Sequence, residues 1–184
     1  MILRAFLRCL KISKEIKSIK SQFPDVQFRS HEFEIKEMLD QARRRHDEYK
    51  KHLNDLKRAT KLSDLFETYT PVDITLDEIG KRIAHQIKGL CRKYPVEQRG
   101  KTNLLFYFNL HDTFFDPAEQ VGRILLQSEN WQSVSVVGSS WGYVFASSIQ
   151  APQYIKKNVG SFRCQENIWD WLDDLRFKRL AANI

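Results

Sequence analysis

FPDVQFRSHEFEIK, residues 23–36, is the most informative stretch of this chain. Two short runs within it alternate polar and apolar residues, as β-strands do, because successive strand side chains point to opposite faces. The first run carries Asp25, and the second carries Glu34 and Lys36. With a turn at residues 30–31, Asp25 would face Lys36, and Glu34 would lie diagonally across from Asp25, roughly 7–8 Å away at the backbone. The stretch therefore predicts a hairpin that presents two carboxylates and one lysine on its polar face.

The motif Pro24-Asp25 with Glu34-Ile35-Lys36 resembles the PD-(D/E)xK nuclease superfamily. The wider stretch FPDVQFRSHEFEIKEMLDQARRRHDEY, residues 23–49, is similar to a bacterial family of small endonuclease-like proteins placed in that superfamily. The resemblance extends from the N-terminus to about Trp141. It implies a restriction-endonuclease-like α/β fold with an αβββαβ core, in which helices flank a mixed central sheet.

The resemblance also implies an activity, which is metal-dependent hydrolysis of phosphodiester bonds in DNA, or less readily in RNA, with low sequence specificity. Asp25 and Glu34 would hold Mg²⁺ or Mn²⁺, and Lys36 would position the attacking water. Mg²⁺ prefers oxygen ligands and keeps several waters, so two carboxylates and a substrate phosphate suffice. The ion would polarise the phosphoryl oxygen and lower the pKa of a bound water.

Three other interpretations stay open. Asp25 and Lys36 could form a cross-strand ion pair on a solvated hairpin face, worth roughly 0.2–1 kcal/mol. In addition, many superfamily members carry a further acid on the first core helix, whereas residues 1–10, which have a helical pattern, contain none. The alternative function is therefore a nuclease-like nucleic-acid-binding or adaptor module without catalysis. A third class is an interaction protein with no nucleic-acid role.

Three consecutive arginines, Arg43, Arg44 and Arg45, follow the second strand of the hairpin. Arginine forks match the geometry of phosphate oxygens, which makes these residues the candidate nucleic-acid contacts. They begin a segment, residues 38–62, that we expect to be a long helix; a charge run on such a helix is otherwise an ordinary solvated face. The apolar stripe of this helix consists of Ala42, His46, Tyr49, Leu53 and Leu56.

The remaining periodic segments predict further strands and helices of the same single domain, residues 1–184. Thr75 and Glu78 have the spacing of a capping box at the start of a helix. The expected strands are an edge strand within 14–20, a buried strand at 104–110, and two more at 134–137 and 141–146. The expected helices start at Thr75, at Asp116-Pro117 (running to 127), and at 166 (running to 182 and packed on the domain).

Gly138-Ser139-Ser140-Trp141-Gly142 matches the G-x-S-x-G pattern of a serine-hydrolase nucleophile elbow. That motif requires a helix after the serine and a histidine later in the chain. Here a strand pattern follows, and all five histidines precede Ser140. A bend between two strands explains the match.

The composition is that of a globular protein with a mild preference for polyanions. The net charge is +7, and the isoelectric point is about 9.3, which raises the local concentration of a protein near phosphates without defining a site. Cys9, Cys91 and Cys164 are far apart and include no CxxC pair, which favours a reducing, cytoplasmic location over a disulfide framework or a zinc site. No apolar run is long enough to span a membrane. The expected partner is nucleic acid, with DNA favoured over RNA, and a homodimer is compatible with these features.

Overall fold

The computed structural model describes residues 6, 17–18, 23–40, 45–61, 70–110, 112–120 and 122–164. Arg43, Arg44 and the helix expected over 166–182 lie outside the described residues. No helix in the described part of the chain is both long enough and apolar enough to cross a membrane.

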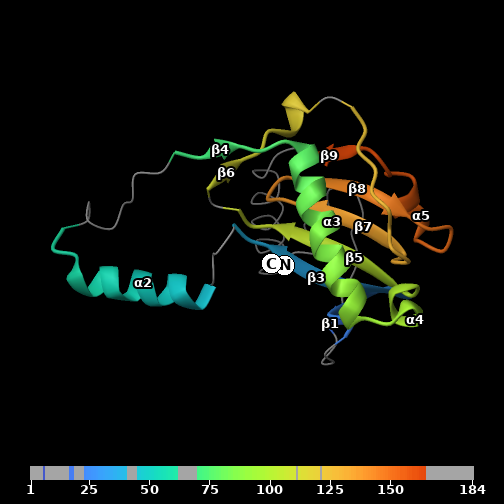
Figure 1. Ribbon diagram of the computed structural model, residues 1–184, viewed down its shortest axis with the longest axis horizontal. Coiled ribbons are helices and arrows are strands. Elements are labelled where there is room, and N and C mark those ends of the chain that lie inside the picture. Colours follow the sequence, from blue (N-terminus) through green and yellow to red (C-terminus); the bar gives the residue numbers. More distant parts are fainter. Residues whose placement is uncertain are drawn as a thin grey trace, which may run out of the picture.

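A seven-stranded mixed sheet forms the centre of the molecule, in the order β1-β2-β3-β5-β7-β8-β9 (Figure 1). The central strands β3, β5 and β7 are parallel, whereas the pairs on either side of them are antiparallel. A mixed α/β fold with a central sheet flanked by helices, as predicted, is therefore confirmed. The strand bounds are β1 Lys17–Ser18, β2 Val26–Phe28, β3 His31–Met38, β5 Thr102–Phe108, β7 Ser133–Val137, β8 Trp141–Ser147 and β9 Phe162–Cys164.

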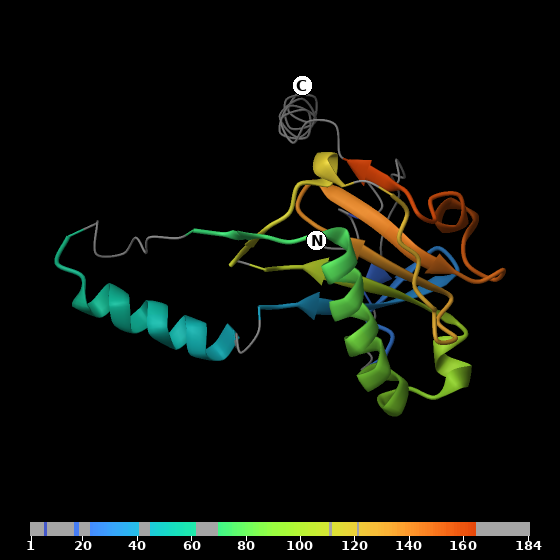
Figure 2. The ribbon, with the colours of Figure 1, turned by 45° about the horizontal axis from the view of Figure 1, so that its top comes forward.

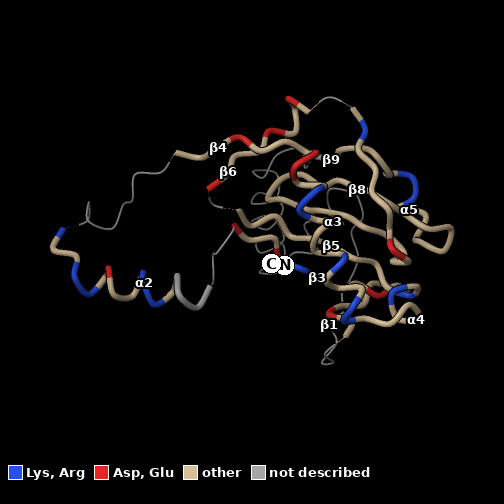
Figure 3. Tube along the Cα trace, viewed as in Figure 1, with Lys and Arg blue, Asp and Glu red and all other residues tan. Residues whose placement is uncertain are grey.

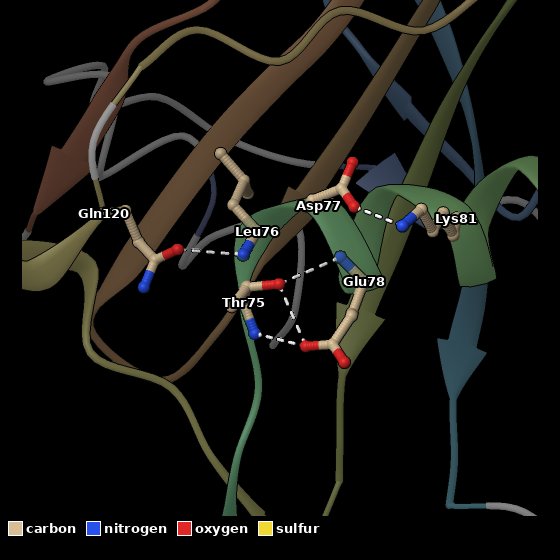
Figure 4. Close-up of polar contacts among 6 residues, drawn as sticks. All are labelled: Thr75, Leu76, Asp77, Glu78, Lys81 and Gln120. Carbon is tan, nitrogen blue, oxygen red and sulfur yellow. Dashed lines mark hydrogen bonds and ion pairs between the residues drawn. The ribbon is translucent and has the colours of Figure 1, made fainter.

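Helix α3, Leu76–Lys93, covers one face of this sheet (Figure 1). The predicted capping box is present: the Thr75 hydroxyl accepts from the Glu78 N–H, and the Glu78 carboxylate accepts from the Thr75 N–H (Figure 4). Isoleucines at steps of four pack against the sheet in one apolar cluster. The opposite face is covered by a second cluster that includes Phe6, which is helical, and the short helix α5, Gln153–Lys156.

Helix α2, Arg45–Arg58, lies apart from the sheet (Figures 1 and 2). The expectation of a long helix from residue 38 to residue 62 is wrong at its start, because β3 continues to Met38 in register with β5. The described part of its predicted stripe does not face the core: Tyr49, Leu53 and Leu56 are 69%, 40% and 59% exposed. The isoleucine stripe of α3 packs on the sheet face.

The helix predicted from Asp116 to residue 127 is also wrong. Asp116 does cap a turn by accepting from the Ala118 N–H, but the turn is a 3-10 helix, η2, that ends at Glu119. Gly122 then adopts a φ of +96°, outside the helical region. Several further short elements were not expected: α4, Val96–Arg99; α5; β9; and a parallel pair formed by β4, Val72–Asp73, and β6, Thr113–Phe114.

The interpretation of the glycine-serine motif as a bend is confirmed. Residues 138–140 connect β7 to β8, and the Gly138 N–H donates to the Trp141 carbonyl at 2.9 Å. A Cβ at Gly138 would overlap the Trp141 indole, which is buried in an aromatic cluster. The glycine is required for this close approach.

Candidate functional site

The hairpin that carries the motif forms, but in a different register from the one predicted. Its turn consists of Arg29 and Ser30, so Phe28 pairs with His31, and Val26 pairs with Phe33. This register, continued one residue beyond β2, would bring Asp25 opposite Glu34 rather than Lys36. Arg29 closes this tight connection with a φ of 55°. The slip changes each cross-strand partner by two residues. Because the strand period is two, every side chain stays on its predicted face.

Asp25 is fixed by the backbone of the neighbouring strand. Its Oδ2 accepts the Ile35 N–H at 2.7 Å, which holds the half-buried carboxylate against the Glu34–Ile35 peptide. The structure therefore places the Asp25 carboxylate at the peptide that follows Glu34.

Glu34 is not on an open surface, contrary to expectation. Its side chain is 1% exposed, because the polar face of the hairpin is the face that the α3 side of the molecule covers. Oε1 accepts the Tyr94 hydroxyl at 2.8 Å and also forms an ion pair with Lys36 Nζ. Oε2 is buried and has no hydrogen-bond partner among the described residues.

Tyr94, which the sequence analysis missed, forms the wall over Glu34. It follows the last residue of α3, and its N–H donates to the Leu90 carbonyl. Its ring stacks on Phe23 with a centroid distance of 4.6 Å and meets Trp131 edge-on at 5.8 Å. A tyrosine before a proline at a helix end is not a sequence signal for a site, so only the tertiary contacts could reveal it.

Lys36 is the more exposed member of the ion pair, with 25% of its side chain exposed. Burial lowers the pKa of Lys36, but the hydrogen bond and negative charge of Glu34, with a contribution from Tyr94, outweigh burial and raise the pKa above its ordinary value. The ammonium group also lies 5.7 Å from the centroid of the Tyr94 ring. Lys36 is therefore a cation at neutral pH and can serve as a counter-charge, not as a general base.

The described residues contain no cluster of three or more His, Cys, Asp or Glu side chains suited to a metal ion. Asp25 and Glu34 both supply carboxylate oxygens, which fit Mg²⁺ or Mn²⁺, because these ions prefer oxygen and take only one or two carboxylates from a protein. The partnerless Glu34 Oε2 supports this fit, since a buried carboxylate oxygen without a partner is energetically costly.

No contact among the described residues brings the predicted phosphate-binding arginines to this site. Arg45 begins α2, which stands away from the sheet, and its side chain is not described; Arg43 and Arg44 lie outside the described residues. Figure 3 shows basic residues distributed along α2, α3 and α5.

The chain is similar in fold to the solved structure of a protein of unknown function from Pseudomonas aeruginosa strain PAO1, described as Monooxygenase Superfamily. The TM-score is 0.63 at 19% sequence identity, with 90% of this chain and 80% of that chain covered, so the likeness concerns the fold alone. No curated protein matches the chain. A family model does match, over residues 1–167, and the chain belongs to that family, which is described as "Putative endonuclease, protein of unknown function (DUF1780)".

Proposed function

We propose that the protein is a metal-dependent nuclease of the restriction-endonuclease-like type that hydrolyses phosphodiester bonds in DNA or, with lower preference, in RNA. The observation that supports the proposal is the hydrogen bond from the Ile35 N–H to the Asp25 carboxylate, directly after Glu34, together with one Glu34 oxygen that is buried and partnerless among the described residues. Membership of an endonuclease-named family supports the same class of substrate.

In this proposal Asp25 and Glu34 hold Mg²⁺ or Mn²⁺, which when bound neutralises phosphate charge and lowers the pKa of a coordinated water. The Ile35 N–H orients Asp25, and the Tyr94 hydroxyl and Lys36 orient Glu34. Lys36, kept cationic by Glu34, positions the attacking water and offsets the charge that builds up on the phosphate. The partly exposed Asp25 and Lys36 mark the side from which a phosphate approaches.

Low sequence specificity follows from the absence, in the described ranges and in the sequence, of any element that reads bases in the major groove. Arg43, Arg44 and Arg45 are the proposed backbone contacts, which would add affinity for any sequence.

The test is cleavage of single-stranded DNA, double-stranded DNA and RNA with and without Mg²⁺ or Mn²⁺. Asp25→Asn, Glu34→Gln and Lys36→Met should each lower the rate by about 100-fold or more, as loss of a positioned catalytic group does. Glu32→Gln is the matched control, because Glu32 lies two residues from Glu34 on the same face of β3. Equal cleavage by all five proteins would identify a contaminant and overturn the proposal.

One observation favours a second candidate, a nuclease-like nucleic-acid-binding or adaptor module. Glu34 is buried beneath Tyr94 and already paired with Lys36, as a purely structural ion pair would be. Titration calorimetry with Mn²⁺ separates the two, since a carboxylate site should bind Mn²⁺ and lose it in Asp25→Asn. DNA binding that weakens with salt, combined with no Mn²⁺ binding, would favour the adaptor.

A further inference from the structure

Helix α2 presents an apolar stripe that nothing in the described part of its own chain covers. Tyr49, Leu53 and Leu56 are spaced by four and three residues, which places them on one side of the helix, and all three are exposed. The views in Figures 1 and 2 agree that α2 stands away from the sheet and from α3. A 14-residue helix is marginal in water on its own, so its stability depends on packing against a partner.

The stripe has a basic edge. Lys50 and Lys57 are seven residues apart and follow Tyr49 and Leu56 by one position each, so they line one side of the apolar stripe. Lys51 and Arg58 lie on the opposite side of the helix. The surface that fits this stripe is therefore apolar in its floor and negative at its rim.

A pocket with that chemistry exists elsewhere on the same chain, beside β4, β6, η2 and the start of α3. It has a volume of about 390 Å³, and Ile74, Leu76, Ile124 and the 54% exposed Phe114 supply its apolar lining. Its other lining residues are four carboxylates and two uncharged polar side chains: Asp73, Asp77, Asp116, Glu119, Thr75 and Gln120.

No lysine or arginine lines the pocket, although the chain carries a net charge of +7. The acids around β4, β6 and η2 are visible in Figure 3. Some of the lining groups already have structural roles: Asp77 pairs with Lys81 at 2.5 Å, and Gln120 accepts the Leu76 N–H at 2.9 Å (Figure 4). Asp73 and Glu119 are exposed and lie outside the contacts drawn there.

We propose that α2 of one chain docks into this pocket on a second copy of the chain, and that the second copy returns the same contact. One chain carries both complementary surfaces, and a reciprocal exchange closes with two-fold symmetry and leaves neither surface uncovered. A helix of 14 residues is about 21 Å long. Each chain contributes both a helix and a pocket, so the dimer contains this contact twice. A stable dimer needs an interface of roughly 800 Å² per partner, and two copies of the contact favour an interface of that size. This inference is independent of the proposed nuclease activity.

The test is a charge exchange in the full chain, with mass measured by light scattering after gel filtration over a range of concentrations. Wild type should be a dimer. Lys50→Glu with Lys57→Glu (the arm variant) and Asp73→Lys with Glu119→Lys (the pocket variant) should each weaken the dimer by tenfold or more, because each places like charges in both contacts. An equimolar mixture of the two should form a heterodimer, since opposite charges then meet in both contacts. All four substitutions in one chain should restore the homodimer.

Lys51→Glu with Arg58→Glu is the matched control, because it makes the same charge change on the opposite side of α2 and should leave the dimer intact. Far-ultraviolet circular dichroism and melting temperatures establish that each variant is folded. A wild type that is monomeric at every concentration would overturn the proposal. A pocket variant that dimerises like wild type would show that α2 does not dock into this pocket, and would also overturn the proposal.

Discussion

The Tyr94 hydroxyl donates a hydrogen bond to Glu34 Oε1 at 2.8 Å, across 60 residues of sequence. This bond joins the end of α3 to the centre of β3 at the only carboxylate of the described sheet that is both buried and ion-paired. It holds the glutamate of the motif in one orientation and closes one side of the site.

Removing the Tyr94 hydroxyl should destabilise the protein. In Tyr94→Phe, Glu34 loses a buried hydrogen bond to a charged group, and the free energy of unfolding should fall by about 1–3 kcal/mol, measured by urea denaturation. Tyr154→Phe is the matched control, since the Tyr154 hydroxyl is buried with no partner in the described ranges. That control should be neutral or slightly stabilising. A Tyr94→Phe protein as stable as wild type would show that the bond contributes nothing.

Glu34 and Lys36 should behave as a coupled pair. Glu34→Gln leaves the partly buried ammonium without its counter-charge, and Lys36→Met leaves a buried carboxylate without its cation. The double variant removes both charges and should cost less than the two single losses added together, by about 1–3 kcal/mol. Urea denaturation of the four proteins measures this coupling energy. Additivity within about 0.5 kcal/mol would mean that the two groups act independently.

Stability should fall at alkaline pH, in part through Lys36. Its pKa in the folded protein is raised above the ordinary 10.5, so its contribution is fully present below pH 10.5 and is lost as the pH rises through the folded-state value. Burial also raises the pKa of Tyr143 and Tyr154, which adds to the same fall. The free energy of unfolding measured from pH 8 upward should therefore decline less steeply in Lys36→Met than in wild type. Lys88→Met, at an exposed position of α3, should keep the wild-type slope.

Two glycine substitutions should have opposite effects. A methyl group at Gly138 would collide with the buried Trp141 ring, so Gly138→Ala should cost about 1–3 kcal/mol through overpacking. Gly89 is exposed within α3, and a Cβ there would meet nothing within 4 Å. Gly89→Ala should therefore raise stability by about 0.5–1 kcal/mol through helix propensity. Thermal and urea denaturation of both variants check the two signs, and a stable Gly138→Ala protein would show that the Trp141 ring can shift.

The apolar stripes of α2 and α3 show what a local sequence pattern can predict and what it cannot. Thr75 and Glu78 predict the start of α3 correctly, because a capping box is satisfied within one turn of backbone. The stripe containing Tyr49 and Leu53 also predicts a helix, and α2 is one. Periodicity could not say which of the two helices would cover the sheet, because that depends on competition between two apolar surfaces for one face.

Local sequence was enough to predict the hairpin and the face of β3 that carries Glu34 and Lys36, because strand alternation is a property of the local backbone. The tertiary structure set the register of the hairpin, with Val26 opposite Phe33, because a slip of two residues preserves every face and leaves the alternation unchanged. It also decided that Glu34 is buried beneath Tyr94, because that contact depends on how α3 packs across the sheet.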